Sequence, residues 1–356
     1  MIILYKLPAM RYHKDKVINL FSAQERLHDL AQMGDSLYTL SHHIDFEFFR
    51  PRLEEGLYAS YDQSVGGRPP FDPVMMFKVL VLQRLYNLSD EAIEFQIKDR
   101  LSFMRFLGLD FGGVVPDAKT IWYFREQLQK QGLVKKLFDE MNSYLEKHGI
   151  IANKGQMIDA TFVEVPRQRN SREENKQIKE GEEPQWEENK SRQKDTDARW
   201  AKKHNKSYFG YKDHVIADRK SKLIKDYTVT SASVHDSRQL TNLTNKGQAE
   251  GQTLYADSAY RSAEIEDELA GKGVKSRIHF KAARNLPLTE QEESSNKSRS
   301  RFRSRVEHIF GFMENSMGGK FIRACNKARN EVHIGMMNIT YNLCRIKQLN
   351  KSVRLT

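Results

Sequence analysis

Near residue 155 the hydrophobic pattern of the chain changes from helical spacing to a mixture of strand-like and helical segments. From about residue 17 to 149, apolar residues recur with helical spacing and turn signals separate the segments. From "QMIDATFVEV" onward, apolar residues alternate with polar ones or run together as in strands, with helical segments between them. Such a chain is expected to form an N-terminal α-helical part, followed by a mixed β-sheet with helices on both faces, which is an α+β or α/β architecture.

One helical segment, "FDPVMMFKVLVLQRLYNL", is apolar almost all round. Asp72 is its expected N-cap, Pro73 its first helical residue, and its pattern predicts a buried central helix. Ser89 is the expected N-cap of the next helix, "DEAIEFQIKDR". A later helix, 119–131, is a candidate recognition helix of a helix-turn-helix motif, although the turn before it has about ten residues instead of three or four. Two interpretations of the helical part stay open. It could read DNA bases directly, or it could be a helical bundle that packs on the rest of the chain and holds a second copy.

The charge balance favours a polyanionic partner. Lys plus Arg number 58 against 47 for Asp plus Glu, which gives a net charge of +11 over 356 residues. The two cysteines cannot form a disulfide framework, and they do not form a CxxC zinc motif. The chain has no apolar run of about 18 residues and no signal-peptide pattern, so we expect no membrane contact and a cytoplasmic, nucleoid-associated protein.

Three carboxylates stand where a solvated surface charge is not expected. Asp159 interrupts an apolar strand-like run, Asp257 ends another, and Glu307 lies one turn after Arg303 on a helix that is otherwise apolar and basic. Carboxylates from distant segments that converge on rigid elements make a site for two Mg²⁺ or Mn²⁺ ions acting on phosphate esters. With this net charge, the ester is expected to be DNA.

Each carboxylate also has a purely structural interpretation. Asp159 could be a salt-bridged strand residue, because a buried carboxylate needs a cation or hydrogen-bond donors. Asp257 could cap the helix at 261–270, although serines nearby can do the same. Glu307 could simply pair with Arg303 within the helix.

Cations that could contact phosphates lie in two places. The densely charged segment 166–206 is predicted to be mostly a flexible surface loop. The last part of this segment, "RQKDTDARWAKKHNK", combines clustered cations with Trp200, an aromatic residue suited to base stacking. The second place is the basic run 296–305 with the following "MGGK" loop. The candidate DNA-contacting residues are Trp200, Lys202, Lys203, Arg299, Arg301, Arg303, Arg305 and Lys320.

Four further polar residues are candidates for supporting the metal ligands. His235 and Asp236 could lie near the metals, although a simpler interpretation is an N-cap of the helix at 237–245. Asn338 and Asn342 share one face of the last helix and could hold a ligand carboxylate, or hydrogen-bond within an interface.

Several long motifs, in order, resemble one known family. The segment "GRPPFDPVMMFKVLVLQRLYNLSDEAIEFQIKDRLSFMRFLGL" is similar to the N-terminal helical domain of bacterial insertion-sequence transposases. The segments "IDATFVEVPRQRN", "RQKDTDARWAKKH", "YFGYKDHV", "ASVHDS", "YADSAYRS" and "RVEHIFG" with "MGGK" resemble the catalytic domain of the same group, the insertion-sequence five type. The resemblance covers roughly 35 to 350.

This resemblance implies an RNase H-like fold with an Asp, Asp, Glu metal triad at Asp159, Asp257 and Glu307. The related signature of Tyr, Arg, Glu and Lys around the third carboxylate is partly present. Its Tyr position holds Ser300 and its Lys position holds Glu314, so Lys320 is the candidate replacement for that cation.

The resemblance further implies a DNA transposase that binds the terminal inverted repeats of its own element as a dimer or larger assembly, cleaves double-stranded DNA and joins the new end to target DNA. The implied organisation is an N-terminal extension at 1–34, a helical DNA-binding and dimerisation domain at 35–150, and a catalytic domain at 151–350 with its insertion at 166–206. The alternatives are a nuclease that does not join DNA, and a DNA-binding derivative that has lost catalysis.

Overall fold

The N-terminal part of the protein is helical in the residues that the structure describes. The computed structural model describes residues 21–58, 69–203, 205–246, 251–282 and 287–353. The N-terminal elements are α1 (Ser22–Gln32), α2 (Ser36–His43), the 3-10 helix η1 (Phe46–Phe49), α3 (Arg50–Tyr58), α4 (Pro73–Leu85), α5 (Asp90–Asp99), α6 (Leu101–Leu107), α7 (Ala118–Lys130) and α8 (Leu133–Lys147).

The predicted helix starts are confirmed at side-chain level. The Asp72 carboxylate accepts a hydrogen bond from the backbone N–H of Met75, and the Ser89 hydroxyl accepts one from Ala92. Such caps satisfy N–H groups that have no partner within the helix. The helix that follows Asp72, α4, is buried almost all round, as its sequence predicts.

The second part is a mixed sheet. Within the described residues it has six strands: β1 (Gln156–Glu164), β2 (Arg199–Lys203), β3 (Lys206–Asp218), β4 (Ile224–Ser231), β5 (Thr253–Ala256) and β6 (Lys275–Ile278). The main order is β2-β3-β1-β5-β6, and β4 also pairs with β3. The pairs of β3 with β1, β2 and β4 are antiparallel, whereas β1 with β5 and β5 with β6 are parallel. This is the RNase H-like arrangement that the resemblance implied.

Helices cover both faces of the sheet. The helices of this part are α9 (Arg172–Glu180), α10 (Glu188–Ser191), η2 (Asp236–Gln239), α11 (Leu240–Lys246), η3 (Ser258–Tyr260), α12 (Ala263–Gly271), α13 (Glu290–Ser316) and α14 (Lys327–Gln348), of which α9 and α10 lie in the insertion and not on the sheet. Successive side chains of β1 point to opposite faces. Accordingly, Met157 joins a large core shared with α8, α13 and α14, while Ile158 joins a smaller core with α11 and α12. The predicted fold class is confirmed.

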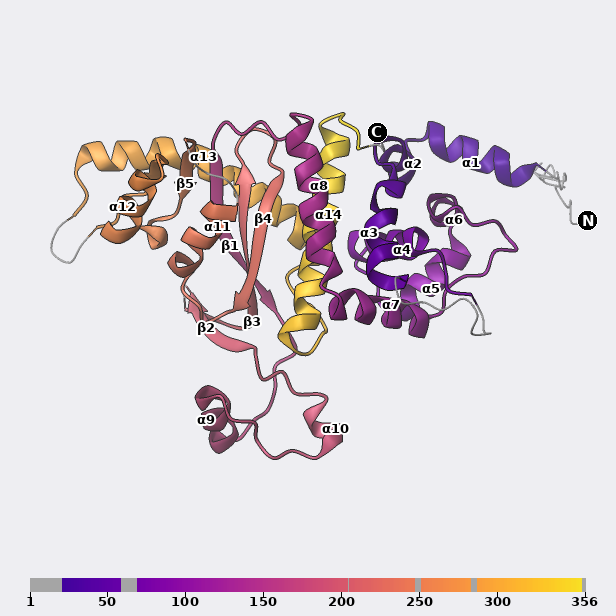
Figure 1. The fold of residues 1–356 in the computed structure, drawn as a ribbon, viewed down its shortest axis with the longest axis horizontal. Helices are drawn as coiled ribbons and strands as arrows, with labels where there is room; N and C mark the ends of the chain where they lie inside the picture. The colour runs from indigo at the N-terminus through magenta and orange to yellow at the C-terminus, as the bar shows by residue number, and fades with distance from the viewer. Residues whose placement is uncertain (1–20, 59–68, 204, 247–250, 283–286, 354–356) are drawn as a thin grey trace, which may run out of the picture.

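The large core continues from the sheet into the N-terminal helices. Helix α14 packs on β4 and α8 and also on α2, α4 and α7. Figure 1 shows α14, in yellow, beside α8 and between the sheet and the N-terminal helices. Its residues from Ile334 to Cys344 are buried without exception. One helix thus provides packing surface for both parts of the molecule.

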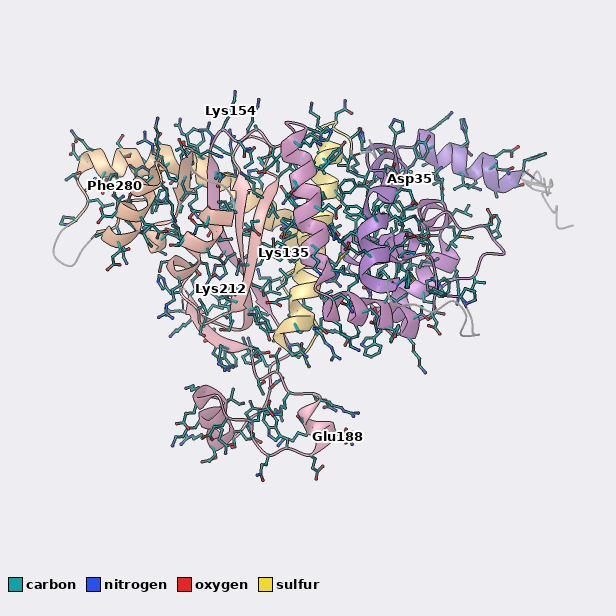
Figure 2. All side chains as sticks on the ribbon, viewed as in Figure 1. Asp35, Lys135, Lys154, Glu188, Lys212 and Phe280 are labelled. Carbon is teal, nitrogen blue, oxygen red and sulfur yellow. The ribbon has the colours of Figure 1, made fainter. Side chains whose placement is uncertain are left out.

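The insertion differs from the loop that its composition predicted. It projects from the sheet and contains α9 and α10, and Glu188 in α10 lies far from the sheet (Figures 1 and 2). Ser171 and Glu174 form a capping box at the start of α9. The Glu174 carboxylate also accepts a 2.6 Å hydrogen bond from the indole N–H of Trp186. These local contacts order a segment that has few aliphatic residues.

Among the described residues, no helix has the length and apolar character needed to cross a membrane.

Candidate active site

Asp159 lies in the middle of β1, on the face covered by α13. Its side chain is only 14 % exposed, and its Oδ2 accepts a 3.2 Å hydrogen bond from Nη1 of Arg303 on α13. Burial raises the pKa of Asp159 to about 6, although the N–H of Ala160 and the charges of Arg303 and Lys203 act in the opposite direction. The carboxylate is therefore short of positive charge even with the arginine in contact.

Asp257 follows the last residue of β5, the strand beside β1. Burial alone would raise its pKa, but the hydroxyl and N–H of Ser258 and the charge of Arg303 outweigh burial, and the pKa lies below its ordinary value. Asp257 caps the short η3. It does not cap the longer helix α12, whose N-cap is Ser262. The alternative interpretation of Asp257 as the cap of that helix is therefore wrong.

Glu307 lies on α13 one turn after Arg303, with 57 % of its side chain exposed. Its Oε1 accepts a 3.1 Å hydrogen bond from Nη2 of Arg303, so the predicted pair within the helix exists. The same guanidinium contacts Asp159 through its other terminal nitrogen. Arg303 thus bridges the first and third carboxylates of the predicted triad, which the helical spacing alone could not reveal.

The buried hydroxyl of Tyr260 lies in the electrostatic field of three carboxylates. Tyr260 is buried and its hydroxyl has no hydrogen-bond partner among the described residues. Burial, together with the negative charges of Asp159, Asp236 and Asp257, raises its pKa well above the ordinary value. The phenol therefore lies within electrostatic range of two triad members and of the acid in the "VHDS" motif. The sequence analysis missed Tyr260, although it stands in the same "YADSAYRS" motif as Asp257.

Asp236 and His235 have partners of their own. Asp236 accepts a 2.7 Å hydrogen bond from Nζ of Lys212, a buried lysine on β3 that Figure 2 labels on the sheet. Nδ1 of His235 accepts from the N–H of Ser237 and caps η2. The capping interpretation of this motif holds for His235, while Asp236 forms an ion pair with the sheet.

Lys320 is held next to β1 by the "MGGK" loop. Its carbonyl accepts from the N–H of Glu164 at the end of β1, and its Nζ lies 3.1 Å from a carboxylate oxygen of Glu314. Glu314 also accepts a hydrogen bond from Thr161, two residues after Asp159 on the same face. The acid at the signature lysine position is therefore paired with Lys320, which brings a cation to that place.

The glycines of this loop allow close contacts on two sides. Gly318 has a φ of +59°, and a Cβ there would lie 2.1 Å from the Asn87 side chain, just after α4. A Cβ on Gly319 would lie 2.2 Å from the sulfur of Met337 on α14. A larger residue at either position would have to displace a neighbouring side chain, and at 319 its Cβ would also lie 3.0 Å from the carbonyl of Met313. The two glycines therefore let the loop that carries Lys320 pack closely on both neighbours.

The predicted DNA-contacting residues fall into two groups. Trp200, Lys202 and Lys203 on β2 are exposed, and Lys203 lies near enough to lower the pKa of Asp159. Arg301 on α13 is also exposed.

The other arginines of α13 are engaged within the protein. Arg299 is buried, donates to the carbonyl of Ile278 and stacks 4.2 Å from the ring of Phe280, which Figure 2 labels. Arg305 donates a 3.0 Å hydrogen bond to the carbonyl of Arg219. These contacts favour a structural role for Arg299, whose head group would have to leave a buried position to reach DNA.

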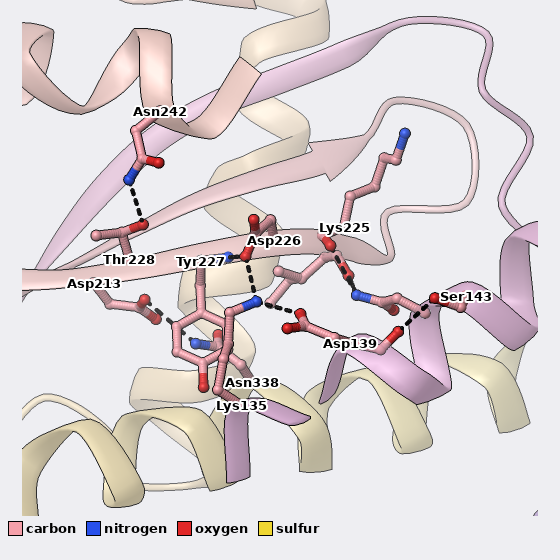
Figure 3. A network of polar contacts seen from close by, with 12 residues as sticks. Lys135, Asp139, Ser143, Asp213, Lys225, Asp226, Tyr227, Thr228, Asn242 and Asn338 are labelled. Atoms are coloured by element: carbon pink, nitrogen blue, oxygen red, sulfur yellow. Dashed lines mark hydrogen bonds and ion pairs between the residues drawn. The ribbon is translucent and has the colours of Figure 1, made fainter. Parts of the chain in front are cut away.

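Asn338 and Asn342 hydrogen-bond away from the triad. Asn338 donates a 3.3 Å hydrogen bond to Asp213 on β3 (Figure 3), and Asn342 exchanges hydrogen bonds with the backbone of Ile224 at the start of β4. Both asparagines join α14 to the sheet. The interpretation as interface hydrogen bonds therefore describes them better than support of a metal ligand.

The chemistry of the triad fits a divalent cation. Carboxylate oxygens are the ligands that Mg²⁺ and Mn²⁺ prefer, and the desolvated Asp159 would be stabilised by added positive charge. In the described part of the chain, no three acidic, His or Cys side chains are close enough together to hold an ion as they stand. The guanidinium of Arg303 lies between Asp159 and Glu307 and donates a hydrogen bond to each.

Comparison with known proteins gives the family. Residues 153–343 match the model of the transposase DDE domain, and residues 25–127 match that of a transposase domain of the DUF772 type. Among solved structures, the piggyBac transposase synaptic complex with hairpin DNA is similar with a TM-score of 0.43 and 12 % identity, covering 90 % of this chain and 77 % of that chain. The Mos1 strand transfer complex has a TM-score of 0.21 and 11 % identity, covering 93 % and 97 %.

The structural likenesses are weak, and the assignment rests on the family models. The DDE model alone spans more than half of the chain. The more specific insertion-sequence five type stays a prediction. The protein belongs to the family of the transposase DDE domain and is a DNA transposase.

Proposed function

We propose that this transposase binds the terminal inverted repeats of its own element, cuts DNA there, and joins the exposed 3′-hydroxyl to target DNA. One observation carries the proposal: Arg303 draws Asp159 of β1 and Glu307 of α13 onto one guanidinium, beside the strand that ends at Asp257. The charge of the same guanidinium also lowers the pKa of Asp257, so all three acids interact with one cation, and three carboxylates can hold the divalent ions that phosphoryl transfer uses.

Asp159, Asp257 and Glu307 are the residues that would hold divalent ions. When bound, such ions activate an attacking oxygen and neutralise charge on the phosphate. Arg303, once displaced from the carboxylates, has a free planar fork of donors that suits a phosphate group. Lys320 and Lys203 are held beside β1 and Asp159 and can contact neighbouring phosphates.

The exposed hairpin of β2 and β3 can guide the DNA strand. Trp200 is 51 % exposed, and its ring lies 5.4 Å from the guanidinium of Arg167. An exposed aromatic ring beside cations suits base stacking together with phosphate contact.

For the helical part we propose repeat binding and assembly of a dimer or larger complex, with residues 35–150 as one domain and residues 151–350 as the catalytic domain. Helix α7 buries Ile121, Phe124 and Leu128 and packs on α14, while Trp122 and Tyr123 face outward. This packing favours a docked bundle that presents an exposed aromatic face to DNA or to a second copy.

A strand-transfer assay with Mg²⁺ and labelled ends of the element tests the proposal. Asp159→Asn, Asp257→Asn and Glu307→Gln are each expected to lower joining by at least about 10³-fold while DNA binding persists, because each removes a ligand that only the reaction requires. Glu293→Gln, an exposed acid near the start of α13, is the matched control and should retain activity.

The products separate this function from its alternatives. Nicked DNA without joined products would identify a nuclease, and a mobility shift without any cleavage would identify a DNA-binding derivative. Full joining activity in any of the three triad variants would refute the assignment of that residue.

A further inference from the structure

A cavity of about 470 Å³ lies where the N-terminal helices meet the "MGGK" loop and α14. Its walls come from the end of α4, the start of α5, the segment 318–323 and α14. Gly318 lies close to the side chain of Asn87, so the loop packs against the end of α4. The cavity therefore lies between segments that are far apart in the sequence.

One residue of this wall, Arg84, is a buried cation. It is in the last turn of α4, only 9 % of it is exposed, and its guanidinium makes no hydrogen bond or ion pair with any described residue. Burial, and then the charge of Arg125, lower its pKa to about 10. An uncompensated buried charge is strongly unfavourable, so its position calls for an anion.

The neighbouring arginine, Arg125, is paired with an acid, as buried arginines usually are. Arg125 of α7 forms a bidentate pair with Asp90, at 2.8 and 2.7 Å, and Gln83 also hydrogen-bonds to that acid. Asp90 is therefore engaged by these partners, and its charge acts on Arg84 only without a hydrogen bond, raising the arginine's pKa by less than burial lowers it. The remaining acid in the cavity wall is Glu91, which is exposed.

Further cations extend the cavity. A second hollow of about 270 Å³ shares Asp90, Arg125, Arg323 and His333 with the first, and it adds Arg192 and Arg329. Arg329 is paired with Glu126, whereas Arg323 is exposed at the boundary of both hollows. Arg323 comes three residues after Lys320, so the cationic surface continues toward the candidate active site.

We propose that this cavity is a phosphate-binding site in which Arg84 and Arg323 hold a single phosphate group. A phosphate would supply the missing counter-charge, and it accepts the parallel N–H donors of a guanidinium. Its source is a backbone phosphate of DNA that crosses from the helical part to the catalytic part. This identification of the source rests on the proposed function, whereas the phosphate chemistry does not.

Thermal unfolding with inorganic phosphate tests the site itself. In phosphate, compared with chloride at equal ionic strength, the wild type and the control Arg172→Met are expected to gain roughly 2–4 °C in Tm. Arg84→Met and Arg323→Met should lose that gain. Arg172 is exposed on the distant insertion, so it reports the general effect of phosphate on stability. An equal gain in all four proteins overturns the proposal.

Folding of Arg84→Met is not expected to limit the test. Replacing an unpaired buried charge by an apolar side chain of similar length is expected to leave the protein in chloride at least as stable as the wild type. Arg323 is exposed, and its substitution provides an independent measurement of the same cavity.

Binding of a short random-sequence duplex without metal identifies the source of the phosphate. For a DNA phosphate, Arg84→Met should lower the slope of log K against log salt concentration by about one, and Arg172→Met should leave it unchanged. A lost phosphate gain in Tm with an unchanged DNA slope would overturn the DNA assignment and identify a site for free phosphate. If the wild type shows no strand transfer although Arg84→Met loses the phosphate gain in Tm and lowers the salt slope of DNA binding, the result would count against the proposed function alone.

Discussion

Individual buried acids of this protein are stabilised in different ways, and the difference decides how each responds to pH. Asp226 on β4 pairs with Lys135 at 2.7 Å. Asp213 on β3 has only the amide of Asn338, at 3.3 Å, and its second oxygen has no partner among the described residues (Figure 3). Burial raises the pKa of Asp213 to about 7, with only the Asn338 hydrogen bond acting against it.

We predict that Asp213→Asn stabilises the protein above pH 7. The folded-state pKa of Asp213 lies above its unfolded value, so the folded state loses stability as pH rises from about 4 through 7. Removing the ionisable group should raise the free energy of unfolding at pH 8 by about 1–4 kcal/mol and leave it nearly unchanged at pH 4. Urea unfolding at both pH values measures this.

Asp226→Asn is the matched control on the adjacent strand. It removes the partner of Lys135 and is expected to destabilise the protein at pH 8, by about 1 kcal/mol. Opposite changes in the free energy of unfolding at pH 8 would show that Asp213 lacks the stabilising partner that Asp226 has. Parallel pH curves for the wild type and Asp213→Asn would show that Asp213 titrates normally.

Among the elements, the "MGGK" loop contacts several separate parts of the molecule. It runs between the end of α4 and α14 and reaches the end of β1, where residues 320 and 322 hydrogen-bond to Glu164. The loop thereby connects the helical part, the candidate active site and the cavity at Arg84. Its "GGK" sequence is not a Walker A phosphate-binding motif, because the preceding glycine of that motif is absent.

We predict that Gly319→Ala destabilises the protein by about 1–3 kcal/mol, because the added methyl group overlaps Met337 and lies 3.0 Å from the carbonyl of Met313. It should also lower strand transfer by displacing Lys320. Chemical denaturation and the joining assay measure the two effects.

Gly311→Ala on α13 is the control for that substitution. A Cβ at Gly311 meets no atom within 4 Å, and alanine favours a helix interior over glycine by about 1 kcal/mol. This variant is expected to be slightly more stable than the wild type. If Gly319→Ala behaves in the same way, the close approach of the loop to α14 is not present in solution.

The sequence predicted features that are encoded by neighbouring residues. The caps at Asp72 and Ser89, the buried α4 and the change from helices to strands depend on local spacing, and the structure confirms them. The contact between Arg303 and Asp159 joins residues 144 positions apart, and no local pattern encodes it. The helices of the insertion were missed because side-chain hydrogen bonds, and not an apolar face, order them.

At the scale of the whole molecule, α14 makes the two parts interdependent. The large core includes residues of α4 and α7 on one side and of β3 and β4 on the other, and α14 contributes to both. Neither part buries its apolar face without this helix. Cooperative unfolding is expected when elements share one core.

We predict that the helical part and the sheet unfold in a single transition. Trp122 on α7 and Trp200 on β2 report on the two parts. Two variants that each retain one of these tryptophans, with phenylalanine at the other tryptophan positions, should give the same fluorescence midpoint in urea. Midpoints that differ beyond the small shift caused by the substitutions would show independent units.

The place of α14 in the chain has a consequence for synthesis. Helix α4 ends at Leu85, and its buried partner α14 begins only at Lys327. At translation rates of about 5–20 residues per second, roughly 10–50 seconds separate the emergence of these two helices. During that interval the apolar surface of α4 that α14 later covers is exposed beside the ribosome, so the nascent helical part is a substrate for chaperones until α14 emerges.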